Sequence, residues 1–542
     1  MIRYLVPFLN KHKIKMCVYA LLGVILALLG IIEPYFQSNF LDEIVYGTEP
    51  EKFYLNVSIV IILNVFTLFI SCFSQLYTAK VRTRISFEMI SHTIEHVQKI
   101  PLLKVKKFDP AYLTSRISSD TNAVLSFFLN NFTNIIISPV TIIVSLGILI
   151  KINPVLALIS IACIPAYLII YIALKHPLAR TRKIYIENQN EFTGKLTEGL
   201  SLIEEIKTEG IYSKYLVQIA AFFEKVFSSY IKALNVDVAF SSIHAVVGLI
   251  FQFSNLIYGG LLVSKGILSI GEYTLINIYF FYVLKQVNYF LNLGKEYQNA
   301  NVSFIRLKEL LGYHIEKNGD KKIENIHKLS ASGIAFSYEY EGNNIIGNFT
   351  RDFIPGKLFC IIGDNGSGKT TLLNILIYLI QDVNSGEIKI NDKDVANVDF
   401  YDARLNLISV VKQNPKFPKE NVFNLLQQHS NTNVSLEKIN SIIEIWNLHE
   451  LYYNEQFNLM NVMGKSMLEL SGGEQQKMAL LFALIKTPNV LILDEPTSAM
   501  DKRSSDIVID FLHQYKREHI TVCISHDQRI IYACDELIEL PS

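Results

Sequence analysis

Six long apolar runs in the first part of the chain constrain its fold more than any other feature. A transmembrane helix needs about 20 mostly apolar residues to cross the hydrocarbon core of a bilayer. Any one run could instead be a buried helix of a soluble protein, but six in one half of a 542-residue chain favour a membrane domain. We place the spans near residues 16–36, 56–78, 131–150, 154–174, 243–263 and 274–294.

Basic residues at the span ends orient this all-α, six-helix domain. By the positive-inside rule these ends are cytoplasmic, and an even number of spans keeps both termini there. We therefore expect a multi-pass protein of the cell (plasma) membrane with its second half in the cytoplasm. Residues 1–15 lack a small-residue cleavage site and are expected to form a retained amphipathic helix at the membrane surface. The basic residues are Lys11, Lys13 and Lys15 before the first span, Lys80, Arg82 and Arg84 after the second, Lys175, Arg180, Arg182 and Lys183 after the fourth, and Lys295 and Arg306 after the sixth.

Composition excludes several other classes. Lys plus Arg and Asp plus Glu both number 50, so no charge excess indicates a nucleic-acid partner. The six cysteines form no CxxC pair, so neither a zinc site nor a disulfide framework is indicated.

The residue pattern of the chain changes after the sixth span. We assign residues 1–312 to the membrane domain, whose connections 80–130 and 176–240 have helical periodicity and extend the helices into the cytoplasm. The charged stretch 313–324 is expected to be a linker. From 325 to 542, short β-rich runs alternate with helical stretches, which predicts an α/β domain with a largely parallel sheet.

A phosphate-binding loop opens this second domain. The run KLFCII predicts a buried strand, and Gly363 to Thr370 fit the pattern GxxxxGK[ST] with a helix start behind them. Glycines let the backbone N–H groups face a phosphate, the lysine reaches the β- and γ-phosphates, and the hydroxyl after it binds Mg²⁺. The expected ATP-binding residues here are Gly363, Asp364, Asn365, Gly366, Ser367, Gly368, Lys369, Thr370 and Thr371.

Further strand ends carry polar side chains that suit ATP hydrolysis. Asp494 ends the run NVLILD, where a carboxylate can hold Mg²⁺, and Glu495 follows as the candidate general base. The alternative is a capped strand end with a turn at Pro496. His526 ends another buried strand and is a candidate γ-phosphate sensor, although a histidine there is more often a surface or core residue. Gln413 ends a third strand in the same way.

With LSGGE at residues 470–474 added, the whole chain resembles an ATP-binding cassette (ABC) half-transporter of the exporter type. The resemblance implies that Tyr338 stacks on adenine, that Gln413 acts in catalysis and at Mg²⁺ together with Thr370 and Asp494, and that Ser471, Gly472 and Gly473 bind ATP. It also implies coupling regions at 108–124 and 196–210, and a D-loop at 498–501.

Four positions depart from the family pattern. Lys465 stands where exporters of this type usually have Glu, and Met467 where they have Gly. Pro496 and Glu474 also differ from the more frequent Ala and Gln. None of these departures removes a catalytic group.

One chain carries a single phosphate loop and a single signature. The resemblance implies that each ATP lies between the phosphate loop of one chain and the signature of another. We therefore expect a dimer, either a homodimer or a pair with a paralogous half-transporter, in which ATP binding shifts the population toward the closed state.

The transported molecule is the least defined feature. Amide-rich spans favour the export of a peptide or another amphiphile, and the early first span argues against a leader-cleaving peptidase domain. An importer built on the same fold and a lipid flippase remain alternatives. Lys285, Asn255 and Asn288 are the candidate pathway residues. Lys285 near the bilayer middle could bind an anionic substrate group, pair with Glu33, or snorkel to the membrane surface.

Overall fold

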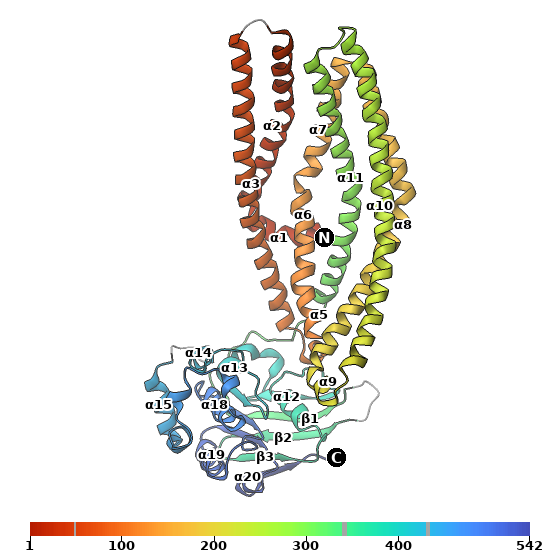
Figure 1. The fold of residues 1–542 in the computed structure, drawn as a ribbon. Coiled ribbons are helices and arrows are strands. Elements are labelled where there is room, and N and C mark those ends of the chain that lie inside the picture. The colour runs from red at the N-terminus through yellow and green to blue at the C-terminus, as the bar shows by residue number, and fades with distance from the viewer. Residues whose placement is uncertain (48–49, 339–343, 430–433, 542) are drawn as a thin grey trace. The chain divides into compact units, whose positions relative to one another are not determined.

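The computed structural model describes residues 1–47, 50–338, 344–429 and 434–541 as two compact units (Figure 1). The first unit comprises Met1–Gln98 and Phe108–Tyr313. The second comprises Lys99–Lys107 and His314–Ser542. This division differs from the expected uninterrupted membrane domain 1–312, because the segment Lys99–Lys107 packs within the second unit.

The first unit is built from helices, several of them far longer than a bilayer requires. The longest, α10, has 53 residues, whereas about 20 suffice to cross a membrane. The elements are α1 (Ile2–Lys11), α2 (Lys13–Tyr46), α3 (Pro50–Gln98), α5 (Pro110–Thr114), the π-helical turn η1 (Ser115–Asp120), α6 (Thr121–Phe132), α7 (Asn134–Ile152), α8 (Pro154–Ser201), α9 (Ile203–Glu209), α10 (Tyr212–Ser264) and α11 (Ile270–Leu311).

Within the described residues, five helical stretches are long and apolar enough to cross a membrane. They are Lys13–Tyr46, Pro50–Gln98, Tyr112–Ile152, Pro154–Ser201 and Tyr212–Ser264. The sixth expected span, 274–294, lies in the 42-residue helix α11, which does not reach the same apolar threshold because Asn277, Lys285 and Gln286 interrupt it. The side chain of Lys295 lies outside the described part of the chain.

Local capping chemistry sets the helix boundaries of this unit. Asn153 alone separates α7 from α8, and its side chain accepts hydrogen bonds from the backbone N–H groups of Val155 and Leu156 at 3.1 and 3.2 Å. This cap, with Pro154 in the first turn, produces the tight hairpin that the sequence predicts. Ser269 caps α11 in the same way and donates from Oγ to Asp42 near the end of α2 at 2.7 Å.

The amino-terminal helix packs onto the first unit through one fully buried side chain. Leu5 of α1 lies in a cluster with Ile85 and Met89 of α3 and Val124 of α6. His12, directly after α1, forms a 3.1 Å contact from Nε2 to Glu88 Oε1. Residues 1–15 thus form part of the folded unit.

The second unit contains two sheets. The first, antiparallel and in the order β2-β1-β4-β5, was not predicted from the sequence. The second has the order β6-β7-β8-β3-β9 and is parallel throughout, as predicted from its buried runs. The strands are β1 (Leu329–Phe336), β2 (Ile346–Phe353), β3 (Leu358–Ile362), β4 (Ser385–Ile390), β5 (Lys393–Asp394), β6 (Ile408–Val411), β7 (Val490–Asp494), β8 (Ile520–Ile524) and β9 (Glu536–Glu539).

Helices cover the parallel sheet and complete two hydrophobic clusters, one on each side. The helix α18 is almost wholly buried, from Gln476 to Leu484. The helices are α4 (Leu102–Val105), α12 (Lys369–Leu376), η2 (Val395–Asn397), α13 (Phe400–Asn406), α14 (Val422–Gln428), α15 (Leu436–Ile445), α16 (His449–Tyr452), α17 (Leu459–Val462), η3 (Met467–Glu469), α18 (Gly472–Leu484), α19 (Lys502–Tyr515) and α20 (Gln528–Ala533).

The segment Lys99–Lys107 joins the second unit through two contacts. Leu103 of α4 packs against one of the hydrophobic clusters. The carbonyl of Lys99 accepts a hydrogen bond from the N–H of Glu316 at 2.6 Å. This segment lies just upstream of the coupling region 108–124 expected from the resemblance, which belongs to the first unit.

Candidate nucleotide site

The parallel sheet brings the predicted catalytic residues to one edge. Strands β3, β8, β7 and β6 are neighbours in that order, and all run the same way. Their carboxyl ends therefore lie at one edge, where α/β proteins bind their ligands. The phosphate loop follows β3, His526 follows β8, Asp494 ends β7, and Gln413 follows β6.

The phosphate loop has a backbone that only glycine tolerates at its key turns. Gly363 and Gly368 have φ of 154° and 90°. A Cβ on Gly363 would lie 2.6 Å from Ser367 Oγ, and one on Gly368 would lie 2.7 Å from a methyl of Ile345. The loop ends at the start of α12, so its N–H groups and the helix terminus together form an anion-binding turn.

Two side chains of this loop fit a phosphate ligand. Lys369 donates from Nζ to the carbonyls of Gly363 and Asp364 at 2.6 and 2.9 Å, which holds the ammonium over the loop. In the part of the chain that the structure describes, the buried hydroxyl of Ser367 makes no hydrogen bond. A buried polar atom without a partner is rare in proteins, and a phosphate oxygen would supply the missing partner.

Glu495 contacts the two other predicted catalytic side chains. Gln413 donates from Nε2 to Glu495 Oε2 at 2.6 Å, and His526 Nε2 lies 3.9 Å from Glu495 Oε1. Glu495 has φ of 49°, a left-handed conformation that is costly for a residue with a side chain. A 2.8 Å hydrogen bond from its N–H to the carbonyl of Ile524 holds it there.

Asp494 and Thr370 supply oxygen atoms that fit Mg²⁺. Burial raises the pKa of the Asp494 carboxyl, and Glu495 raises it further, whereas Lys369 and a hydrogen bond from Thr370 lower it. No group of three His, Cys, Asp or Glu side chains could hold a metal among the described residues. Mg²⁺ suits such a sparse site, because it keeps several waters and binds through one or two protein oxygens plus substrate phosphates.

Tyr338 remains exposed beside α12, the helix that follows the phosphate loop. Its ring is 58% exposed, and its hydroxyl lies 2.8 Å from Thr371 Oγ1 on α12. The ring also makes an edge contact with Phe336 at 5.1 Å. An exposed aromatic ring of this kind can stack on a planar base.

The signature residues begin helix α18. Ser471 and Glu474 form a reciprocal capping box, and Ser471 Oγ also donates to Glu474 Oε2 at 2.8 Å. A Cβ on Gly473 would lie 2.7 Å from the carbonyl of Ala499 in the D-loop. Ser471 and Gly472 are exposed, so the signature presents a helix start to solvent.

Three of the residues that depart from the family pattern differ in their burial. Met467 is fully buried and belongs to a hydrophobic cluster, so it fills space that a glycine would leave open. Lys465 is exposed. Pro496 is buried directly behind Glu495.

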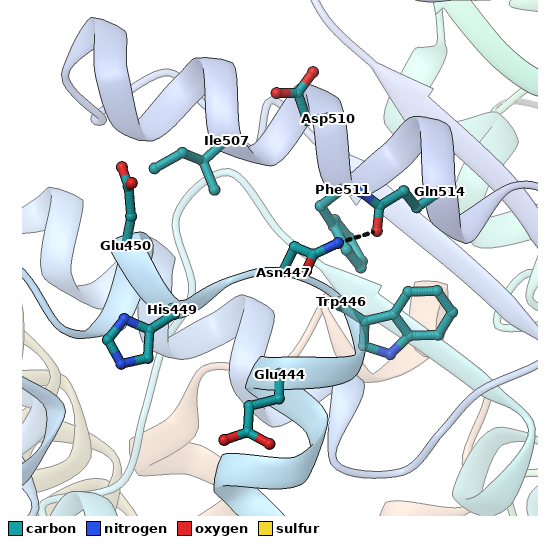
Figure 2. A pocket seen from close by; sticks show the side chains of 9 residues that line it. All are labelled: Glu444, Trp446, Asn447, His449, Glu450, Ile507, Asp510, Phe511 and Gln514. Carbon is teal, nitrogen blue, oxygen red and sulfur yellow. Dashed lines mark hydrogen bonds between the residues drawn. The ribbon is translucent and has the colours of Figure 1, made fainter.

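A separate cavity of about 450 Å³ in the second unit does not suit a nucleotide (Figure 2). Its wall contains three carboxylates and no residue of the phosphate loop or signature, and carboxylates repel phosphate. Asn447 crosses it to donate from Nδ2 to Gln514 Oε1 at 3.0 Å. The cavity is lined by Glu444, Trp446, Asn447, His449, Glu450, Ile507, Asp510, Phe511 and Gln514.

The three candidate pathway residues have different surroundings in the structure. Asn255 is buried, and both of its amide atoms lack a hydrogen-bond partner within the described structure. Lys285 is exposed and makes no ion pair with any described residue, while Glu33 accepts instead from Gln37 at 2.8 Å. Asn288 lines a large cavity, of about 960 Å³, between α8, α10 and α11.

Sequence reasoning missed the cationic residues of this cavity, of which Lys175 and Arg182 make no ion pair with a described residue. Both entered the sequence argument only as markers of orientation. Their spacing of seven residues places them on one face of a helix, two turns apart, and this was the available signal.

Comparison with known families gives two matches that together cover most of the chain. A family model described as "ABC transporter transmembrane region" matches residues 16–287, and one described as "ABC transporter" matches residues 346–498.

Similar proteins include exporters of several kinds. The putative multidrug export ATP-binding/permease protein YgaD of Bacillus subtilis is 23% identical over 99% of this chain and 93% of its own length. The lactococcin-A transport/processing protein LcnC of Lactococcus lactis is 23% identical over 92% of this chain and 69% of its own. The fold is that of a bacterial Atm1-family ABC exporter solved with ATP bound, with a TM-score of 0.82 and 16% identity over 98% of this chain and 94% of that one.

Proposed function

The chain belongs to the ABC transporter family, and from that premise we propose that it exports a peptide or another amphiphilic molecule by alternating access. It is an integral membrane protein that binds ATP and couples ATP hydrolysis to transport. The meeting of Gln413, Glu495 and His526 beside the phosphate loop supports the ATP-driven part of the proposal, and the exporters among the similar proteins support the direction of transport. The second unit lies on the cytoplasmic side of the plasma membrane, in keeping with the basic span ends.

ATP is held and hydrolysed by the residues at the sheet edge. Residues 363–371 bind the phosphates, with Lys369 on the β- and γ-phosphates, and the ring of Tyr338 carries the adenine. Thr370, Asp494 and Gln413 hold Mg²⁺, which neutralises phosphate charge when it is bound. Glu495 orients and deprotonates the attacking water, with Gln413 fixing its carboxylate. His526 contacts the γ-phosphate.

The signature serves the ATP of a second copy of the chain. Within one chain, Ser471 hydrogen-bonds to Glu474 and opens its helix toward solvent. Half-transporters of this fold typically dimerise. A homodimer then completes two equal sites, each with Lys369 from one chain and Ser471, Gly472 and Gly473 from the other.

Complementation between two defective chains tests this assembly. Lys369→Ala and Ser471→Arg are each expected to abolish ATP hydrolysis in the purified chain. A mixed dimer of the two, isolated through different affinity tags, keeps one site with both native halves and regains activity. No recovery in the mixed dimer would show that the two motifs do not combine between copies. Lack of ATPase activity in the purified native chain would instead point to a paralogous partner.

Flux measurements test the direction and the class of transport. Proteoliposomes with outward-facing ATP sites should accumulate an exported amphiphile in their lumen when ATP and Mg²⁺ are added. The pathway proposed for it includes Asn288, Asn255 and Lys285. Loss of substrate from the lumen would support an importer, and movement of labelled lipid between leaflets would support a flippase.

A further inference from the structure

A cavity of about 960 Å³ lies within the first unit and is lined by residues of α8, α10 and α11. These three helices pack on one another (Figure 1). Its volume is in the range of small-molecule binding sites. Predicted spans four to six place it at their cytoplasmic ends. The wall combines apolar side chains such as Leu178 and Phe240 with the amides of Asn288 and Asn292.

The positive charge of the wall is not cancelled by its carboxylates. Glu187 pairs with Lys183 at 3.7 Å, and Asp237 is also engaged. Within the described residues, neither Lys175 nor Arg182 makes an ion pair. The guanidinium of Arg182 instead lies over the ring of Tyr185, 5.4 Å from its centroid. Two cations of the wall are therefore free to meet an anion.

Three nitrogens of the same wall are buried and lack a hydrogen-bond partner in the described structure: Arg182 Nε, His244 Nε2 and Arg306 Nε. The ring of His244 is held by stacking on Tyr167, with centroids 4.0 Å apart. Arg306 is held by Asp120, which accepts from its Nη2 at 2.5 Å. Buried polar atoms are normally satisfied, so three in one wall point to an acceptor-rich ligand.

We propose that this cavity binds the anionic head group of the transported amphiphile, with Arg182 and Lys175 as its cationic contacts. This inference rests on the export function proposed above and names the substrate class: a molecule with a carboxylate or phosphate on an apolar body. Arg182 offers a planar fork that matches such groups, and Lys175 adds a second charge two helical turns away. The apolar body lies against the side chains of Leu178 and Phe240.

Matched amphiphiles that differ in one charge test the proposal. The probes are dodecanoylglycine and dodecanoylglycinamide, and binding to the full-length chain in phosphatidylcholine nanodiscs is measured with empty nanodiscs subtracted. The native chain should prefer the carboxylate by about tenfold, the effect expected of a charge-assisted contact. Arg182→Gln and Lys175→Gln should each remove most of that preference, and Arg182→Lys should keep part of it.

Arg180→Gln is the matched control, since Arg180 lies on the same helix, is exposed and does not line the cavity. It should keep the full carboxylate preference. Equal binding of the two probes by the native chain would overturn the proposal. So would a preference that survives Arg182→Gln together with Lys175→Gln in protein that still binds ATP.

Two further measurements separate the possible causes of failure and the sources of the anion. Phosphatidylglycerol in the nanodiscs should compete for binding only if a bilayer head group is also a ligand, and loss of that competition in Arg182→Gln would support the anion site. Carboxylate preference without ATP-driven flux in the native chain would contradict the export function and leave the anion site standing. ATP-driven flux without a carboxylate preference would contradict the anion site and leave the export function standing.

Discussion

Gln413 donates a 2.6 Å hydrogen bond to the carboxylate of Glu495 across the ends of the adjacent strands β6 and β7. The two residues are 82 positions apart in the sequence. The contact uses one oxygen of Glu495 and leaves the other facing His526 at 3.9 Å. The parallel pairing of β6, β7 and β8 brings these three side chains together.

Glu495→Gln should bind ATP and scarcely hydrolyse it. The amide keeps the shape of the side chain but cannot accept a proton, so we expect hydrolysis to fall by about 10²- to 10⁴-fold. Phosphate release and ATP binding, measured on the same full-length protein, check this. Glu495→Asp, which keeps a shortened base, should retain more activity than the amide. Native turnover in Glu495→Gln would refute the general-base role.

Asp494→Asn should abolish Mg²⁺-dependent hydrolysis while raising the stability of the nucleotide-free protein. Burial raises the pKa of Asp494, so its ionised form is disfavoured in the fold. A raised carboxyl pKa means that folding is penalised at every pH above the ordinary value, and the penalty disappears as pH falls through the folded-state pKa. The amide carries no such penalty. A lower melting temperature for Asp494→Asn at pH 7 would contradict this account.

The sequence reveals the strands that carry the candidate catalytic residues because each is a short, largely apolar run with a glycine or a polar residue directly after it. Strands β3, β6, β7 and β8 all have this form, and their parallel pairing places the polar residues together. The antiparallel sheet escaped prediction because its strands mix exposed and buried residues without a clean alternation. In β2, for example, Gly347 and Asn348 are both exposed, and Asn348 has φ of 49°.

The sequence reasoning did not recover features that depend on tertiary packing. Leu103 belongs to a helix of four residues, too short for any periodicity, yet it joins the second unit. Lys285 looked informative because a charge within an apolar run is costly. The structure instead makes Arg182 a cavity residue, since α8 continues beyond the bilayer length and turns the face carrying Lys175 and Arg182 toward α10 and α11.

Gly473→Ala should destabilise the second unit by about 1–3 kcal/mol, the usual cost of overpacking. A methyl group there would lie 2.7 Å from the backbone carbonyl of Ala499, which cannot move without disturbing the D-loop. Gly472→Ala is the matched control, because its methyl would meet only the Ala499 side chain, at 3.6 Å. Denaturant unfolding should show no loss for Gly472→Ala. Equal stability of the two variants would exclude the steric explanation.

Asp120→Asn should cost the first unit about 3–5 kcal/mol, the range for breaking a buried ion pair. Asp120 is 1% exposed and accepts from Arg116 at 3.1 Å and from Arg306 at 2.5 Å, so its loss strands two cations. Glu187→Gln breaks the exposed pair with Lys183 and should cost less than about 1 kcal/mol. Thermal unfolding in detergent compares the two. Similar losses of stability in both variants would show that burial of Asp120 does not make its ion pairs more important than the exposed pair.

Acid should weaken the second unit through His519, beside Trp446, the only tryptophan of the chain. Burial lowers the pKa of His519, so the imidazole of the folded protein takes up its proton at a lower pH than that of the unfolded chain. The unfolded chain therefore holds more protons than the folded chain just below pH 6.5. The free energy of unfolding decreases as the pH is lowered from there, until the pH is below the folded-state pKa. The rings of Tyr515 and Trp446 pack on the imidazole, with centroids 4.2 and 5.7 Å away.

Tryptophan fluorescence of the full-length protein reports both effects. The melting temperature read from Trp446 should fall between pH 7 and pH 5, and protonation of the contacting imidazole should quench the emission. His519→Phe keeps the aromatic packing and removes the titrating group, so its melting temperature should vary less over this range. His513, half-buried in the last turn of α19, offers the control variant His513→Gln, which should keep the native pH dependence. Identical pH profiles for the native chain and His519→Phe would place the acid sensitivity elsewhere.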